Sequence, residues 1–505
     1  MKRTTLSLIA AGAALATVTG FAALTAPDGS AASASGAAER RPVDRSSVLC
    51  PAPSTSELAD TAYTSFTPKA KGSTGKGTAR LVPAVAKSKD GEKDSGGDGK
   101  KSDSADGPEP TLEAAADAVG KPATAKASGA EAPALIGAAD GALAPGWTVQ
   151  QTTEMPAGNG RGLLGLTCGA PDTEFWFPGT STLDERADYV HLTNPDATGA
   201  VVEVELFGPE GTLMPDGGQD ITIAPHSSKP VLLSTLTDKP EADVTAHVTA
   251  RTGRIGAAVQ VSDEELGADW LPASAGPSPS IVLPGIPADA ESVRLVAFAP
   301  GDEDADLKIS LAGPTGPFTP AGNETLHVKS GMTAALDLGD VTKGEAGSLV
   351  LTPSGASEPV VAALQVTRGK GTKRDVAFIP ATDPVGERAT VADNRAKGST
   401  LNITAPRGEA KVRVTASDGS GGGTAVSKTY TVREGSTQAI EPELPSGLKG
   451  TYALTVETLS GTAHAARTLE LPSGKTPMFT IQPLPYDQGS VSVPEAEQDV
   501  AVVQR

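Results

Sequence analysis

Apolar and polar residues alternate along three stretches of this chain with the period of a β-strand. In residues 201–211 (VVEVELFGPEG) the apolar positions are Val202, Val204 and Leu206, with polar residues between them. The pattern returns in residues 306–316 (DLKISLAGPTG) and, more weakly, in residues 410–419 (AKVRVTASDG). A period of two gives a strand one dry face and one wet face. The sequence therefore predicts a protein rich in half-buried strands.

Longer segments around such strands repeat at intervals of roughly 100 residues, the size of one small β-sandwich. Each repeat has a strand of small or aliphatic residues, a polar turn, and an aromatic residue that leads a short apolar run. The aromatic residues are Trp176, Trp270, Phe378 and Phe479. These four recurrences predict four structural units.

We expect an all-β protein made of about four tandem immunoglobulin-like β-sandwich domains. The second unit has the clearest series of short strands, separated by turns such as Asn194-Pro195 and Gly208-Pro209. Their spacing is typical of an immunoglobulin-like sandwich. A β-propeller is the alternative, because its four-stranded blades also repeat. The repeat here is about twice the length of a blade, which favours sandwiches.

The predicted domain organisation follows from these units and from the composition of the segments between them. It consists of a signal peptide or signal anchor (1–26), a linker (27–46), four β-sandwiches (47–172, 173–275, 276–380 and 381–485) and a C-terminal tail (486–505). Within the first sandwich, residues 87–110 contain almost no apolar side chains and mix both charges. This composition predicts a disordered insert.

The N-terminal residues predict export. Lys2 and Arg3 precede an apolar run, residues 6–24, and small residues suited to cleavage follow it. The run is close to the length of about 20 residues that spans a bilayer, so both cleavage and retention as a membrane anchor remain open. We expect an extracellular or cell-envelope location. The two cysteines, Cys50 and Cys168, are then expected to form a disulfide that joins the first and last strands of the first sandwich.

Composition limits the function further. Aromatic residues make up only 3% of the chain, while Gly (57) and Pro (41) are abundant, so each core is expected to be small. The net charge of -19 argues against a nucleic-acid partner, because binding phosphates requires clustered Lys and Arg.

No catalytic, metal-binding or cofactor-binding constellation stands out. The five histidines lack the spacing of a metal site. The segment beginning at Asp302 resembles the start of a calcium loop, but Leu307 and Gly313 stand where that loop requires Gly and Glu. We interpret it as a solvated acidic hairpin, and we predict neither an enzyme nor a cofactor.

One aromatic residue is singled out as a ligand contact. Trp147, in APGWTVQQ, has no counterpart in the other units, whereas Trp176 and Trp270 are interpreted as packing residues at the repeated junction. An exposed Trp147 with its neighbours Gln150 and Gln151 would form a sugar-binding surface.

Four blocks of sequence carry a resemblance to a known family. They are MKRTTLSLIA, VLCPAP around Cys50, PALIGAADGALAPGWTVQQTT, and GRGLLGLTCGAPDTEFWFPG around Cys168. Together they resemble an uncharacterised family of exported proteins from high-GC Gram-positive (actinobacterial) bacteria, defined only as a domain of unknown function. The resemblance extends over nearly all of the chain after the signal and is strongest in residues 133–195. It implies an envelope or secreted location and brings no catalytic residues.

Three functional hypotheses follow. The first is a non-catalytic secreted or membrane-anchored envelope protein, a rod of four sandwiches that acts as a structural or interaction scaffold. Its partner would be an envelope protein or a glycan, with membrane contact only through an uncleaved N-terminal helix. The alternative is a carbohydrate-binding accessory module that uses Trp147, Gln150 and Gln151. The third is a hydrolase whose site assembles between domains, although no nucleophile and base can be paired in the sequence.

Overall fold

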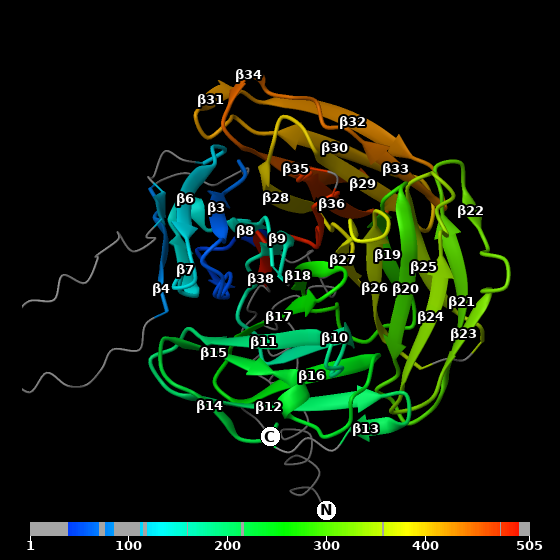
Figure 1. Cartoon of the computed structure of the whole chain (residues 1–505). Helices are drawn as coiled ribbons and strands as arrows, with labels where there is room; N and C mark the ends of the chain where they lie inside the picture. The colour runs from blue at the N-terminus through cyan, green and yellow to red at the C-terminus, as the bar shows by residue number, and fades with distance from the viewer. Residues whose placement is uncertain are drawn as a thin grey trace, which may run out of the picture. The chain divides into compact units, whose positions relative to one another are not determined.

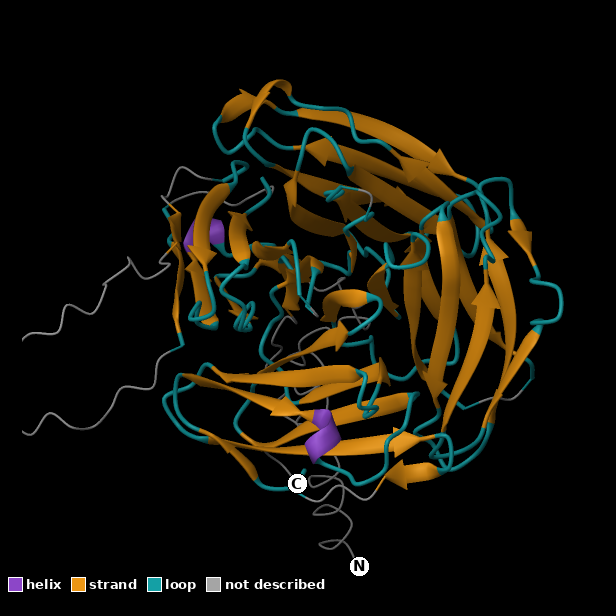
Figure 2. Cartoon of the chain, viewed as in Figure 1, coloured by secondary structure: helices purple, strands orange, loops and turns teal. Residues whose placement is uncertain are grey.

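The computed structural model describes residues 39–69, 76–84, 112–114, 119–158, 160–213, 217–355, 358–474 and 476–493. Regular structure in these residues is β-strand apart from two short 3₁₀ helices, η1 (Gly141–Leu143) and η2 (Leu233–Thr235) (Figure 2). The all-β prediction is confirmed, and the strands form many separate sheets rather than a propeller. The predicted signal (1–26) and insert (87–110) lie outside the described residues. Among the residues described, no helix has the length and apolarity needed to cross a membrane.

The chain divides into two compact units. The smaller unit combines Met1–Arg41 with Ser490–Arg505, and its described part is a two-stranded sheet of β1 (Glu39–Pro42) and β38 (Ser490–Val493). The larger unit, Pro42–Gly489, holds four sandwiches, each built from two sheets that we call its first and second sheet.

The first sandwich encloses a core that includes Leu81 and Tyr63. Its first sheet has the strand order β2 (Arg45–Cys50), β7 (Leu135–Asp140), β4 (Ala79–Pro83) and β5 (Leu112–Ala114). Its second sheet has the order β6 (Ala123–Ser128), β3 (Asp60–Phe66), β8 (Thr148–Met155) and β9 (Gly162–Thr167).

The second sandwich repeats this topology around a core that includes Phe177 and Val259. Its first sheet has the order β10 (Glu174–Thr180), β16 (Val244–Thr252), β12 (Ala200–Gly208) and β13 (Gly211–Leu213), with β14 (Ile221–Ile223) also paired to β12. Its second sheet has the order β15 (Ser227–Leu232), β11 (Arg186–Asn194), β17 (Gly256–Asp263) and β18 (Gly267–Leu271).

The third sandwich follows the same plan, with Leu295 and Leu349 in its core. The first sheet has the order β19 (Ile281–Ile286), β25 (Gly347–Pro353), β21 (Ala305–Ala312) and β22 (Pro317–Phe318), with β23 (Thr325–Val328) also paired to β21. The second sheet has the order β24 (Thr333–Gly339), β20 (Ala290–Phe298), β26 (Val361–Arg368) and β27 (Asp375–Pro380).

The fourth sandwich completes the series around Ile403 and Leu454. The first sheet has the order β28 (Arg388–Asn394), β35 (Tyr452–Ser460), β30 (Ala410–Ala416) and β32 (Val426–Val432). The second sheet has the order β33 (Ser436–Ile440), β29 (Ser399–Ala405), β36 (His464–Glu470) and β37 (Phe479–Pro483). A small additional sheet pairs β31 (Gly422–Thr424) with β34 (Ser446–Lys449).

The alternating segments form strands for the reason expected from their sequence. On β12 the side chains of Val202, Val204 and Leu206 are buried in the core of the second sandwich, while Glu203 and Glu205 lie on the other face. The equivalent strands β21 and β30 show the same alternation of burial. Each sandwich also has a second-sheet edge strand, namely β9, β18, β27 or β37.

In the first sandwich, the repeat predicted from the sequence is shifted by one strand relative to the repeat seen in the structure. Residues 162–168 match residues 254–261 in composition, yet the former contain the edge strand β9 and the latter contain β17, the strand before the edge. Trp176 accordingly lies on β10, the first strand of its sandwich, whereas Trp270 lies on β18, the last. The two tryptophans therefore occupy different positions in the fold.

Neighbouring sandwiches contact one another in a repeated way within the larger unit (Figure 1). The first strand of each sandwich packs on the second sheet of the next: β2 on β17, β10 on β20 and β26, and β19 on β29 and β36. The strand β28 of the fourth sandwich packs in the same manner on β3 and β8 of the first. These head-to-tail contacts close a cycle. The expectation of an extended rod is therefore wrong.

Candidate functional site

The predicted disulfide between Cys50 and Cys168 is present. Cys50 ends β2 at the edge of the first sheet, and Cys168 follows β9 at the edge of the second sheet. Their Cα atoms are 4.7 Å apart, and both side chains are buried. Beside the bond, the Leu49 N–H donates to the carbonyl oxygen of Gly169 at 2.8 Å. The disulfide thus links the two sheets of the first sandwich.

The residues predicted to contact a ligand are buried. Trp147 is only 5% exposed and lies in the core of the first sandwich, where its Nε1–H donates to Ser65 Oγ at 2.8 Å. Gln150 and Gln151, on β8, are 0% exposed. The Oε1 atom of Gln150 accepts a hydrogen bond from Thr167 on β9 at 3.1 Å. The expectation of an exposed sugar-binding surface at these three residues is therefore wrong.

A site that the sequence did not predict lies where the last strands of the four sandwiches meet, which we call the central junction. The strands β9, β18, β27 and β37 contact one another in this order, and β37 also contacts β9 (Figure 1). Asp269 on β18 is completely buried there. Its Oδ1 accepts hydrogen bonds from the Gly165 N–H at 2.9 Å and from Thr480 Oγ1 at 3.2 Å. One carboxyl of the second sandwich thus binds the first and the fourth.

A second buried carboxyl joins the third sandwich to the fourth. Asp375 begins β27, and its Oδ2 accepts a hydrogen bond from the Phe479 N–H of β37 at 2.9 Å. Arg161, which precedes β9, donates from Nη2 to the carbonyl oxygens of Glu265 at 2.7 Å and Arg374 at 3.4 Å. These contacts connect all four sandwiches through their last strands or the turns before them.

The strands of the junction approach one another closely at Gly165. A Cβ atom at this position would collide with the side chains of Gln482 and Thr480 on β37. Gln482 Nε2 in turn donates to Thr480 Oγ1 at 2.6 Å. Glycine is therefore required here because β9 and β37 leave no space for a side chain.

Burial changes the protonation of both carboxyls. Desolvation raises the pKa of Asp375 to about 8, against the lowering effect of its hydrogen bonds and of Arg161 and Arg368. Desolvation also raises the pKa of Asp269 well above its ordinary value. A carboxyl kept protonated at neutral pH can act as a general acid. However, both side chains are fully buried, so this arrangement suits hydrogen bonding between strands of different sandwiches rather than contact with a substrate.

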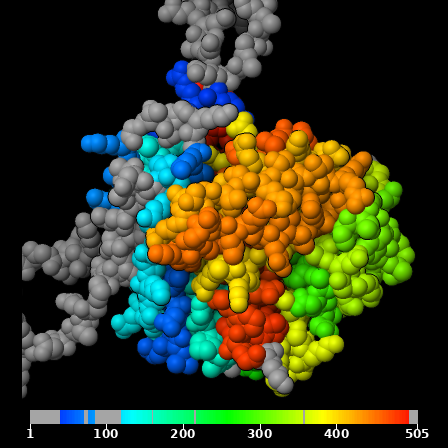
Figure 3. Space-filling view, turned by 90° about the horizontal axis from the view of Figure 1, so that it is seen from above, coloured from blue at the N-terminus to red at the C-terminus, as the bar shows by residue number. Residues whose placement is uncertain are grey.

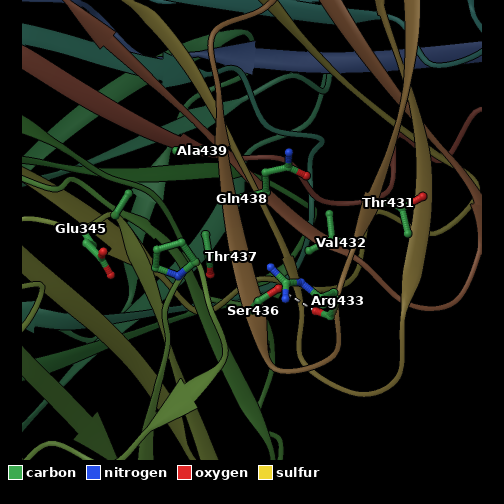
Figure 4. Close-up of a pocket in the computed structure, with 10 residues that line it drawn as sticks. Glu345, Thr431, Val432, Arg433, Ser436, Thr437, Gln438 and Ala439 are labelled. Carbon is green, nitrogen blue, oxygen red and sulfur yellow. Dashed lines mark hydrogen bonds between the residues drawn. The ribbon is translucent and has the colours of Figure 1, made fainter.

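A surface groove lies between the third and fourth sandwiches (Figure 4). It has a volume of about 360 Å³. Figure 4 shows Glu345 on one side of the groove and, opposite it, Thr431 on β32, Gln438 on β33 and Arg433 in the turn between these strands. One wall is β33, which among the described strands lies at the edge of its sheet beside β29, and whose Thr437 N–H donates to the Gly313 carbonyl oxygen at 3.0 Å. The groove offers polar side chains and a sheet edge to a partner.

The junction residues carried one weak signal in the sequence. Asp269 and Asp375 are acidic residues within or at the start of short apolar runs, GADWLP and RDVAFIP, that recur before the boundary of a sandwich. A charge in such a run is unusual, because burying a charge is costly. The partners Gly165 and Thr480 are distant in sequence and carried no signal.

Residues 123–443 match the model of a family of unknown function, DUF5719. The chain belongs to this family. The match covers well over half of the chain and includes the whole second and third sandwiches. It begins at β6 and ends before β34, so DUF5719 as matched leaves out the strands that complete the first and fourth sandwiches. No curated protein matches the chain.

Proposed function

We propose that this member of the DUF5719 family is a non-catalytic cell-envelope protein that acts as an interaction scaffold. The cyclic packing of the four sandwiches carries this proposal. The first strand of each sandwich packs on the next sandwich, and hydrogen bonds join the four last strands at the central junction. The surface loops and sheet edges therefore keep fixed relative positions. Such a body suits the presentation of several contact surfaces to partner proteins.

We also propose that the protein is exported, either released or held by its N-terminal segment, in an actinobacterial cell. The buried Cys50–Cys168 disulfide supports this location, since structural disulfides persist in oxidising compartments. The charged start and apolar run of residues 2–24 support it as well.

Cell fractionation combined with thiol titration tests the location. We expect the native chain in the envelope or the medium, with no thiol reacting until a reductant is added. Cytoplasmic protein with two free thiols would contradict export. Cross-linking in intact cells, followed by purification of the tagged full chain, tests the scaffold role. We expect discrete cross-linked complexes, and a chain recovered only as itself would count against the proposal.

The carbohydrate-binding alternative now rests on the groove between the third and fourth sandwiches. Its polar side chains, among them Gln438 and Thr431, provide hydrogen-bonding groups that a glycan could use. A glycan array with the wild-type protein and Gln438→Ala tests this alternative, and Gln219→Ala, at an exposed position of the second sandwich, is the matched control. Binding that only Gln438→Ala loses would favour it over the scaffold. Activity-based probing of the purified protein tests the hydrolase hypothesis.

A further inference from the structure

The groove between the third and fourth sandwiches is bounded on one side by β33. Figure 3 shows the fourth sandwich (orange) next to the third (green) on the molecular surface. The strand β33 contacts β25 of the third sandwich across this boundary. Among the described strands, β33 pairs with β29 on one side and with no strand on the other. An edge strand presents backbone N–H and C=O groups on its unpaired side.

The hydrogen bonds around β33 show which of its residues point outwards. The Gly435 N–H donates to the carbonyl oxygen of Ala405 on β29 at 2.8 Å, whereas the Thr437 N–H donates to Gly313 of the third sandwich. The backbone of Thr437 therefore faces away from β29. Alternate residues of an antiparallel strand point to the same side, and the pairing of β29 with β33 is regular. Ala439, two residues beyond Thr437, thus turns its N–H and C=O away from β29 as well.

The outward backbone groups of Ala439 are free to bind a partner. Ala439 is exposed and lines the groove. Among the described residues, its N–H and C=O have no hydrogen-bond partner outside the ladder, from which their direction excludes them. One residue of an extended peptide running antiparallel to β33 would exchange two hydrogen bonds with Ala439. The edge thus offers a donor and an acceptor in the arrangement that an added strand requires.

The second sandwich carries a proline at the corresponding position. The ladder of β33 with β29 ends at Ser436, and the ladder of β15 with β11 ends at Ser227. Ala439 and Pro230 are each the third residue after these ends. Proline has no N–H, and a proline on an edge strand is a common protection against the addition of another strand. The edge of β33 keeps the donor that β15 lacks.

The groove also carries two charges that the protein leaves unpaired. Arg433, in the turn between β32 and β33, and Glu345 of the third sandwich are both exposed. Neither forms an ion pair with another residue of the described ranges, and they lie on opposite sides of the groove (Figure 4). Arginine binds a carboxylate through two parallel N–H bonds. A peptide with an acidic side chain near Arg433 and a basic one near Glu345 would complement both charges.

The composition of the groove favours a peptide over a glycan. None of the described residues that line it is aromatic, so it offers no ring on which the face of a sugar could stack. Strand addition needs only backbone groups along an accessible edge and space for alternate side chains.

We propose that the edge of β33 at Ala439 binds an extended peptide segment of a partner protein, which adds to the sheet as a strand antiparallel to β33. This inference rests on the proposed scaffold role and specifies one of its contact surfaces. Backbone hydrogen bonds give such a complex its affinity, and the alternate side chains of the peptide give it specificity. Thr437 Oγ1 donates to Ser348 Oγ of the third sandwich at 3.0 Å. Because this bond helps to hold β33 against the third sandwich, the groove is preformed, and little ordering is required on binding.

Selection of peptides on the full chain tests the proposal. The immobilised protein is exposed to a phage-displayed library of linear eight-residue peptides. We expect enrichment of peptides that are rich in β-branched residues and contain an acidic residue. A selection that enriches no peptide would overturn the proposal, and a glycan bound equally by the wild type and by Ala439→Pro would then assign the groove to sugars.

Titration of the most enriched peptide, synthesised with capped ends, locates the site. Ala439→Pro should weaken binding at least about tenfold, because the N–H is lost and the ring occupies the path of the added strand. Lys126→Pro, at the corresponding exposed position of β6 in the first sandwich, is the matched control and should bind as the wild type does. Arg433→Gln should weaken binding about threefold, and high salt should abolish this difference.

Two further comparisons complete the test. Hydrogen exchange at Ala439 in the wild-type protein should slow when the peptide is bound, while exchange in β6 stays unchanged, which keeps the proposal testable if Ala439→Pro fails to fold. Unchanged exchange at Ala439, or peptide binding that survives Ala439→Pro, would overturn the strand-addition site and leave the scaffold role standing. A wild-type chain recovered only as itself after cross-linking in cells would instead count against the scaffold role.

Discussion

Replacing Asp375 with Asn tests whether a protonated carboxyl stabilises the central junction. The side chain is fully buried at the start of β27, and its Oδ2 accepts a hydrogen bond from the Phe479 N–H of the fourth sandwich. Burial raises the pKa of Asp375 from 3.8 to about 8. Asparagine has nearly the same shape and keeps an acceptor oxygen, but it cannot ionise.

The sign of the pH dependence follows from where the proton is held more tightly. The folded protein binds the proton of Asp375 more tightly than the unfolded chain does. Protonation of this carboxyl therefore stabilises the fold fully below about pH 4, and the stabilisation is lost as the pH rises towards 8. One pKa unit corresponds to about 1.4 kcal/mol, so this group should lower the free energy of unfolding by roughly 4 kcal/mol between pH 5 and pH 8. Burial raises the pKa of Asp269 in the same direction, and the neighbouring Asp375 carboxylate raises it further, so the two groups are coupled.

Unfolding measurements at pH 5 and pH 8 check this prediction. Between pH 5 and pH 8 the free energy of unfolding should fall by roughly 4 kcal/mol less in Asp375→Asn than in the wild type. The variant should also be more stable than the wild type at pH 8. Hydrogen exchange in β27 and β37 reports on the junction itself, which matters because several sandwiches need not unfold together. Asp302→Asn, at an exposed position of the same sandwich, is the control. Equal pH dependence in the wild type and Asp375→Asn would refute the reasoning.

Three further predictions concern single features of the fold. Replacing both Cys50 and Cys168 with Ala should destabilise the first sandwich by roughly 5 kcal/mol, since the bond closes a long loop, and hydrogen exchange should rise in β2 and β9 but not in the third sandwich. Trp147→Ala should lower the free energy of unfolding by about 3–5 kcal/mol, the usual effect of emptying a core position, and an unchanged melting temperature would show that the ring is not packed there. Burial lowers the pKa of His191 from 6.5 in the unfolded chain to about 4 in the folded protein. The neutral imidazole therefore stabilises the fold fully above pH 6.5, and this contribution is lost as the pH falls towards 4. His191→Gln should remove roughly 3 kcal/mol of the decrease in the free energy of unfolding over this pH range, as measured by thermal unfolding.

The features that the sequence predicted correctly depend on short-range patterns. The strand β12 could be recognised because Val202, Val204 and Leu206 alternate with polar residues, and an alternation of this kind needs no knowledge of what covers the dry face. The disulfide could be predicted because the chain has two cysteines and a predicted export signal.

The errors arose where burial depends on other parts of the chain. Trp147 was expected to be exposed with its neighbours Gln150 and Gln151 because it has no counterpart in the other units, and the two glutamines lie on β8. In the structure one of its faces lies towards the core of the first sandwich and the other is covered by β28 of the fourth. The alignment of β9 with β17 failed for a related reason, because small aliphatic residues suit a strand packed between domains as well as a strand within one.

The sequence by itself determined that the chain is all-β, where its clearest strands run, and which two cysteines bond, because each of these depends on local periodicity or on the number of residues of one type. Only the tertiary structure decided that the fourth sandwich returns to the first and that Asp269 and Asp375 meet partners from other sandwiches. Those contacts join residues 100 or more positions apart, such as Asp375 and Phe479, and no local pattern encodes the distance between such residues once the chain has folded.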